Sequence, residues 1–250
     1  MKIVVLLKQV PDLVEDLEVD ASGKALDTND IKFKLNEFDD HALEEAILLK
    51  ESGAADEVVA MAIDSDGADK MLFTAIAKGA DKAVKLTGGN PADSHQLGKA
   101  FANALGSEGF DMVFTGVQSV DDRDGQLGPI VASYLGAPCV SVVSGVSISG
   151  GTAMVHKEYS GGMMGEFEVD MPAVLGIQAA KQAPRYAPVS KIRQVQEVAS
   201  IEEVSMGDLG SGCGSNVSSM APPAKGSGAE MLDDVEELIE AGVHVVIAAG

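Results

Sequence analysis

Short apolar runs and amphipathic segments alternate along the first 140 residues of the chain. A continuous apolar run bounded by polar turns predicts a strand buried on both faces, and apolar residues at helical spacing predict a helix. The predicted strands cover 2–7, 57–63, 82–86 and 111–116, and the predicted helices cover 35–52, 68–79, 93–106 and 125–136. This alternation predicts an α/β fold with a mostly parallel, doubly wound sheet. Ligands of such sheets bind beyond the carboxyl ends of the strands, near helix N-termini.

The pattern changes after residue 140. Residues 139–177 combine alternating apolar positions with glycine-rich turns, which predicts antiparallel hairpins that extend the sheet. A proline-containing loop then leads into a short helix near residue 190. We therefore expect three regions: an α/β domain at 1–204, a Gly/Ser/Pro linker at 205–228 and a helical C-terminal arm at 229–250. The arm is expected either to contact a partner subunit or to fold back on its own sheet.

Composition narrows the classes of function. The formal charge of the 250 residues is −21, which argues against nucleic-acid binding because that needs a basic face. The charge serves either solubility or the steering of a basic partner. No apolar stretch approaches the roughly 20 residues that a membrane span needs, so membrane insertion is not expected. Cys139 and Cys213 fit no metal spacing, Cys139 is expected to be a buried thiol, and a reducing cytoplasm is the expected compartment.

Residues 115–129, TGVQSVDDRDGQLGP, gather polar side chains directly after a predicted strand. Asp122 and Asp124 imitate the middle of a calcium-binding loop. Val120 and Val131 stand where such a loop needs its first and last acids, so the calcium interpretation fails. We assign no metal site, and no histidine lies near a serine–aspartate pair that would indicate catalysis.

Phosphate binding at the same loop stays open. The chain contains no P-loop motif, and no G-x-G-x-x-G follows the first strand. In one interpretation the exposed N–H groups of residues 125–128, at the start of the next helix, bind an anion. In the other, Asp124 caps that helix, Gly125 relieves the backbone and nothing binds.

Five blocks of the chain, in the right order, resemble the electron transfer flavoprotein β-subunit family. They are KIVVLLKQVPD, LNEFDDHALEEAILLKE, AIAKGADKAV, TGVQSVDDRDGQLGP and LGIQAAKQAPRYAPVSKI. The second block is similar to the family's N-P-F-[DE]-x-x-A-[LV]-E-E-A, with Glu37 in place of the proline. The fifth is similar to a stretch that ends in P-R-Y-x-[ST]-[LV]-x-x-I. Together the blocks cover about residues 1 to 210.

This resemblance implies a sheet of the adenine-nucleotide alpha-hydrolase-like type and a heterodimer with an α subunit. It implies an FAD held mainly by the α subunit, and a nucleotide pocket in this chain that holds structural AMP. The implied role is an electron carrier between an acyl-CoA-type dehydrogenase and a quinone oxidoreductase or other acceptor. In the alternative, the pocket holds a second FAD and the protein is an electron-bifurcating oxidoreductase that uses NADH. A stand-alone nucleotide-binding module is a further alternative.

The resemblance also carries residues over by position. The implied cofactor-binding residues are Leu6, Lys8, Asn36, Ile63, Asp122, Asp124, Gly125, Gln126, Leu127 and Gly128. The implied partner-docking residues are Tyr186, Val189 and Ile192, with Val189 as an apolar anchor.

Some positions depart from the family pattern. Leu127 replaces a residue whose hydroxyl could bind phosphate in the AMP branch, whereas Pro129 is closer to the bifurcating branch. The sequence therefore leaves AMP and a second FAD both open.

Overall fold

The protein is described by a computed structural model at residues 1–214 and 216–222. The chain divides into two compact units, one formed by residues 1–17 and 28–216 and the other by residues 18–27 and 217–250. In the second unit, Val19 and Leu26 form an antiparallel bridge, and the backbone N–H of Met220 donates to the carbonyl of Gly23 at 2.7 Å. The arm expected at 229–250 lies outside the described residues.

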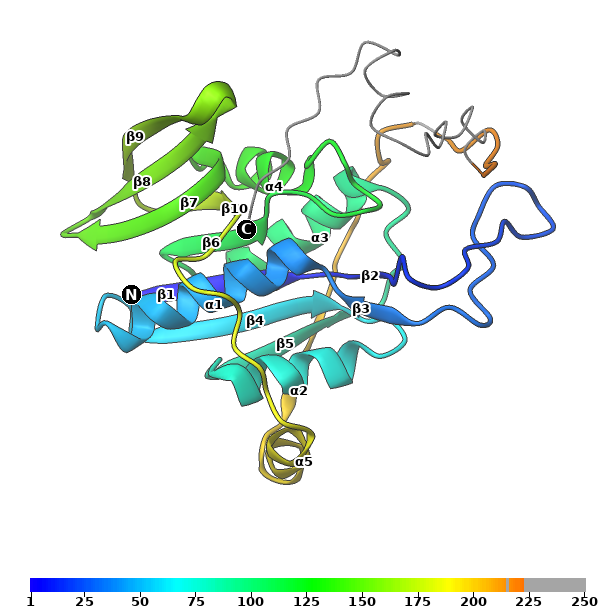
Figure 1. The fold of residues 1–250 in the computed structure, drawn as a ribbon, viewed down its shortest axis with the longest axis horizontal. Coiled ribbons are helices and arrows are strands. Elements are labelled where there is room, and N and C mark those ends of the chain that lie inside the picture. Colours follow the sequence, from blue (N-terminus) through cyan, green and yellow to red (C-terminus); the bar gives the residue numbers. More distant parts are fainter. Residues whose placement is uncertain (215, 223–250) are drawn as a thin grey trace, which may run out of the picture. The chain divides into compact units, whose positions relative to one another are not determined.

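A nine-stranded sheet forms the centre of the first unit, in the order β11-β5-β4-β1-β6-β10-β7-β8-β9 (Figure 1). Its strands are β1 (Lys2–Leu7), β4 (Glu57–Ile63), β5 (Lys82–Thr87), β6 (Met112–Gly116), β7 (Cys139–Ser149), β8 (Thr152–Tyr159), β9 (Met163–Asp170), β10 (Ala173–Ile177) and β11 (Ile201–Ser205). Neighbouring strands pair in parallel from β11 to β7, and β7, β8 and β9 pair antiparallel. The α/β fold class with a mostly parallel sheet and an antiparallel extension is confirmed.

Helices cover both faces of this sheet. They are α1 (Glu37–Glu51), α2 (Ala68–Lys78), α3 (Ser94–Glu108), α4 (Leu127–Leu135) and α5 (Val189–Val198). Successive strand residues point to opposite faces, so Val5 packs in one apolar cluster with α1 and α2, and Leu6 packs in another with α3 and α4. The chain order runs outward from β1 through β4 to β5 and then returns to β6. This reversal puts the topological switch point between β1 and β6, where such sheets bind ligands.

Smaller elements complete the first unit. Strands β2 (Gln9–Pro11) and β3 (Phe33–Leu35) form an antiparallel ribbon, and a 3₁₀ turn at Ser160–Gly162 joins β8 to β9. Helix α5 packs against α2. In the described part of the chain, no helix has the length and apolar character needed to cross a membrane.

Three local expectations need correction, and one strand of the sheet was not expected. Helix α4 begins at Leu127 rather than near residue 125, and β10 joins the sheet in parallel between β6 and β7 instead of forming a hairpin. Strand β11 was not expected, because two adjacent acids interrupt the apolar positions of IEEVS. It extends the sheet by pairing in parallel with β5. Lys82 and Lys85 of β5 form ion pairs with Glu202 and Glu203 of β11. Cys139 is exposed rather than buried, since it is the first residue of β7.

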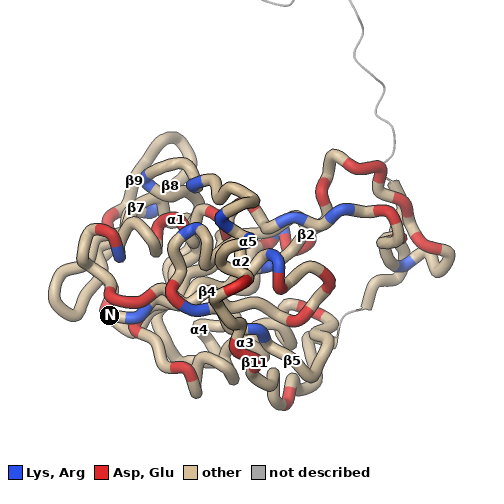
Figure 2. The backbone as a smooth tube through the Cα atoms, turned by 90° about the horizontal axis from the view of Figure 1, so that it is seen from below, with Lys and Arg blue, Asp and Glu red and all other residues tan. Residues whose placement is uncertain are grey.

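The segment that follows β11 lies along α3. Met206 is fully buried, and the side-chain amide of Asn103 donates to the Met206 carbonyl at 2.8 Å. The amide of Gln96 donates to the carbonyl of Gly210 at 3.0 Å. Acidic positions recur along the visible backbone and are interspersed with basic ones (Figure 2).

Candidate functional site

A cavity of about 380 Å³ opens beyond the carboxyl ends of the parallel strands. It lies where the loops after β1, β4, β5 and β6 meet, because parallel strands bring these loops to one edge of the sheet. Its lining is Lys8, Gln9, Phe33, Ile63, Ser65, Asp66, Pro91, Ala92, Asp93, Ser94, Leu97 and Asp121. Five of these residues are apolar and seven are polar or charged, among them the acids Asp66, Asp93 and Asp121.

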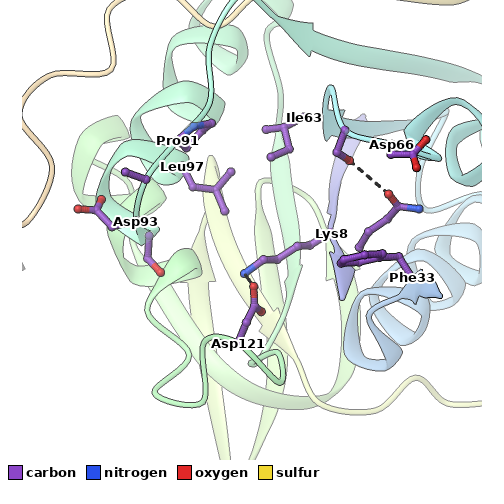
Figure 3. A pocket seen from close by; sticks show the side chains of 12 residues that line it. Lys8, Phe33, Ile63, Asp66, Pro91, Asp93, Leu97 and Asp121 are labelled. Carbon is purple, nitrogen blue, oxygen red and sulfur yellow. Dashed lines mark hydrogen bonds and ion pairs between the residues drawn. The ribbon is translucent and has the colours of Figure 1, made fainter. Parts of the chain in front are cut away.

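Lys8 is the one cationic side chain among the described residues that line this cavity. Its ammonium lies 2.8 Å from Asp121 Oδ2 and donates to Ser119 Oγ at 3.4 Å. Figure 3 shows the Lys8 side chain directed at Asp121, between Ile63 and Leu97 on one side and Phe33 on the other. An anionic ligand would meet Lys8 here, in competition with the Asp121 carboxylate.

The N-terminus of α3 forms another wall of the cavity and is already capped. Asp93 Oδ1 accepts from the Gln96 N–H at 2.9 Å, and Asp93 Oδ2 accepts from the Cys213 N–H at 2.8 Å. These backbone donors lower the pKa of Asp93 to about 2. A fixed negative charge therefore stands at the end of the helix where a phosphate would otherwise be favoured.

A buried carboxylate joins two of the strand ends beside the cavity. Asp39, in the first turn of α1, is 4% exposed. Its Oδ2 accepts from the Lys8 N–H at 2.9 Å, and its Oδ1 accepts from the Gly116 N–H at 2.8 Å. Burial raises the pKa of Asp39 to about 7, against the opposing effect of Asn36 and the two backbone donors. Asp39 thus fixes the ends of β1 and β6 on either side of the switch point.

Gly116 is required by this bridge. A Cβ at Gly116 would lie 2.7 Å from Phe38 Cβ and 2.8 Å from the Asp39 backbone nitrogen, and closer still to Asp39 Oδ1. The sequence interpretation missed Asp39 as a site residue, because an acid in a first helical turn is explained by the helix dipole alone. The one signal in the sequence was its position three residues after Asn36.

The polar loop 115–129 folds back on itself before α4. Asp122 Oδ2 accepts from the N–H groups of Gln126 and Leu127 at 3.0 and 3.3 Å, so Asp122 caps the helix and Asp124 does not. Gly125 has a φ of +64°, and a Cβ there would collide with the carbonyl of Val117. The idea that Gly125 relieves the backbone is confirmed, and the cap assignment to Asp124 is wrong.

The structure places the ten implied cofactor residues in four environments. Lys8 and Ile63 line the large cavity, and Lys8 also lines a neighbouring hollow. That hollow, of about 10 Å³, is bordered among others by Lys8, Asn36, Asp122, Gly125 and Leu127, and it has room for about one water. Leu6 and Gly128 are buried in the core, whereas Asp124 and Gln126 are exposed.

Two polar groups near this loop bear on ligand binding. The Asn36 side-chain amide donates to the Gln118 carbonyl at 2.9 Å, which ties the loop to the start of α1. Thr115 Oγ1 is buried and has no hydrogen-bond partner among the described residues. A Cβ at Gly128 would lie 3.0 Å from this hydroxyl, so an unused donor stands beside the first turn of α4.

The implied docking residues lie away from the cavity, at the start of α5. Tyr186 is 81% exposed and Val189 is 56% exposed, whereas Ile192 is half-buried. No group of three or more metal-binding side chains occurs within the described residues.

Comparisons with known proteins agree on one family. Residues 24–205 match the family model described as electron transfer flavoprotein domain. The chain is 40% identical over 215 residues to "Electron transfer flavoprotein subunit beta" of Methylophilus methylotrophus, covering 84% of this chain and 81% of the relative. It is 36% identical over 192 residues to the protein of the same name from Syntrophomonas wolfei, with 77% and 75% covered. It is 32% identical over 249 residues to that of Mycobacterium tuberculosis, with 94% and 93% covered.

Proposed function

Because the chain belongs to the electron transfer flavoprotein family, as a β subunit, we propose that it forms a heterodimer with an α subunit and carries electrons within it. In this proposal the donor is an acyl-CoA-type dehydrogenase, and the acceptor is a quinone oxidoreductase or another redox protein. The cytoplasmic location expected from the sequence belongs to the same proposal. Support comes from the family and from the exposed apolar residues Tyr186 and Val189, which suit a transient partner.

We propose that the large cavity holds the nucleotide of this subunit, and that this nucleotide is AMP. The observation that carries this proposal is a cavity of about 380 Å³ at the carboxyl ends of the strands, with Lys8 in its lining. That volume is near the lower end of the range of about 300–1,000 Å³ for ligand pockets. It favours a mononucleotide over a dinucleotide such as FAD. Ile63 and Leu97 supply the apolar surface for a base, and Lys8 supplies positive charge for a phosphate.

The start of α4 fits a phosphate only in part. Asp122 already accepts from the N–H groups of Gln126 and Leu127, so a phosphate there would compete with a carboxylate. The unpaired Thr115 hydroxyl beside Gly128 favours a polar ligand group nearby. In our proposal Lys8 therefore bears most of the attraction for the phosphate, and residues 125–128 form the adjoining wall.

FAD, when bound between the two subunits, supplies the redox chemistry of the heterodimer. The proposed contribution of this chain is positioning. Lys8 and the residues around Ile63 hold the structural nucleotide. The docking residues Tyr186, Val189 and Ile192 contact the redox partner.

Nucleotide extraction tests this proposal. The chain is coexpressed with its α subunit, the complex is purified and denatured, and FAD and AMP are measured against protein by chromatography. We expect one FAD and one AMP per heterodimer. Two FAD and no AMP would replace our proposal with the bifurcating alternative. The absence of both nucleotides and of the α subunit would overturn it in favour of a stand-alone module.

A further inference from the structure

The segment between β10 and α5 crosses the outer side of α1 without joining any helix or strand (Figure 1). Three of its backbone N–H groups are instead taken by side chains of α1. The Ala180 N–H donates to His41 Nδ1 at 3.3 Å, and the Lys181 N–H donates to Glu45 Oε2 at 3.0 Å. The Arg185 N–H donates to Glu44 Oε2 at 2.9 Å. Residues 41, 44 and 45 share one face of the helix, so one face of α1 holds both ends of the segment 180–185.

The side chain of Arg185 strengthens the same attachment. Its Nε and Nη2 donate to the Glu44 carboxylate at 2.9 and 2.8 Å, and its Nη1 and Nη2 donate to Glu51 at 2.6 and 3.0 Å. The Glu44 side chain is 3% exposed, whereas that of Glu51 is 54% exposed. Ionised hydrogen bonds with a bidentate guanidinium are about twice as strong as neutral ones, and the buried pair is the less screened of the two.

Burial of two adjacent acids in one helix is costly unless each is compensated. Glu44 and Glu45 are 3% and 1% exposed. Among the described residues, Glu45 Oε1 has no hydrogen-bond partner, so the Lys181 N–H is the bond that offsets burial of this carboxyl. The apolar contacts of α1 with the sheet do not need either acid. Their burial is therefore explained by the segment that they hold.

We propose that Glu44 and Glu45 are positioning residues that fix the segment 180–187 in one conformation, so that Tyr186 and Val189 are presented to a redox partner already ordered. A loop that is ordered before binding loses less entropy when the partner docks, which raises affinity without adding a contact. The docking role rests on the proposed function, whereas the fixing of the segment stands on the contacts alone.

The first test measures the segment itself in the heterodimer with the α subunit. Glu44→Gln keeps the shape of the side chain but removes its charge. Glu45→Met keeps a similar length but removes the oxygen that accepts from the Lys181 N–H. Hydrogen–deuterium exchange of the peptide at 178–188 is followed by mass spectrometry. Glu51→Gln is the matched control, because Glu51 binds the same arginine but accepts from no backbone N–H of the segment.

We expect exchange of this peptide to rise roughly tenfold in Glu44→Gln and in Glu45→Met, which corresponds to about 1.4 kcal/mol. In Glu51→Gln it should rise less than about threefold, as for an exposed pair. Unchanged exchange in both test variants would overturn the inference. So would an equal rise over the whole chain, since that would mean general loss of stability.

The second test measures presentation to the partner. With an acyl-CoA dehydrogenase as electron donor, Glu44→Gln should raise the KM for the flavoprotein and leave kcat unchanged. Faster exchange with an unchanged KM would overturn the presentation role. The FAD and AMP content of the wild type and of each variant is measured in parallel. Absence of nucleotide from the wild-type heterodimer would count against the proposed function and not against the fixing of the segment.

Discussion

Replacing Asp39 by Asn tests whether a buried carboxylate joins the strand ends at the proposed nucleotide site. In the wild-type protein this group accepts two backbone N–H donors, from Lys8 and Gly116. Asn is isosteric and uncharged, so it keeps one acceptor and turns an amide donor toward the other N–H. Relative to the ionised carboxylate, that mismatch costs about 1–3 kcal/mol. The informative quantity is therefore the change of stability with pH, not its absolute value.

The magnitude follows from the two pKa values. Burial raises the pKa of Asp39 from 3.8 to about 7, so between these values the folded state holds a proton that the unfolded state has lost. The free energy of unfolding must then fall as pH rises through this window, and the effect levels off above the folded pKa. Between pH 5 and pH 7 this single group lowers the stability of the wild type by about 2 kcal/mol.

Urea unfolding of the heterodimer at pH 5, 6 and 7, at one protein concentration, measures this slope. Between pH 5 and pH 7, the free energy of unfolding should fall by about 2 kcal/mol less in Asp39→Asn than in the wild type. Glu37→Gln is the matched control, since Glu37 is an exposed acid in the same helical turn and takes part in neither hydrogen bond of the bridge. Parallel curves for the wild type and Asp39→Asn would refute the reasoning that this carboxyl titrates near neutral pH inside the fold.

Three further changes test the site and the docking surface. Lys8→Met should weaken AMP binding to nucleotide-stripped heterodimer by tenfold or more in calorimetry, because it removes the one cation among the described cavity residues. An unchanged Kd would contradict that role. Gly125→Ala should lower stability by about 1–2 kcal/mol more than Gly136→Ala in thermal unfolding, since both have φ near +65° but only Gly125 faces a carbonyl. Val189→Asp should raise the KM of an acyl-CoA dehydrogenase for the flavoprotein at unchanged FAD content, and equal KM values would exclude Val189 as an anchor.

The parallel core of the fold was visible in the sequence because its strands are continuous apolar runs. KIVVLL and EVVAMAI became β1 and β4 with the expected ends. The two strands that were not predicted correctly, β10 and β11, carry no such local signal. β10 is a short apolar strand whose parallel pairing depends on β6 and β7, and no local pattern encodes those neighbours. β11 lies at the edge of the sheet, where Glu202 and Glu203 can face solvent and pair with lysines of β5.

The topology predicted the edge of the sheet at which the cavity lies, and the family resemblance supplied the residues. Lys8 and Ile63 were implied by that resemblance, and both line the cavity. Asp39 could not be found in this way, because its partners lie 31 and 77 residues away in sequence and are backbone N–H groups. Almost every residue type has a backbone N–H, so the sequence does not show which N–H groups a carboxylate will bind.

The apolar pattern of α1 indicates only a helix that packs on the sheet. Its buried acids also hold backbone segments of the proposed site and of the docking region. A loop with no helix or strand partner must still satisfy its N–H groups. Here three buried acids of one helix, Asp39, Glu44 and Glu45, accept from the strand ends at the cavity and from the segment that leads to the docking residues. An apolar replacement at any of them would improve the apolar face of α1 and leave backbone donors unpaired. The role of these acids is therefore to hold the strand ends at the cavity and the segment 180–185. We expect substitutions of these acids to loosen those two regions before they unfold the rest of the domain.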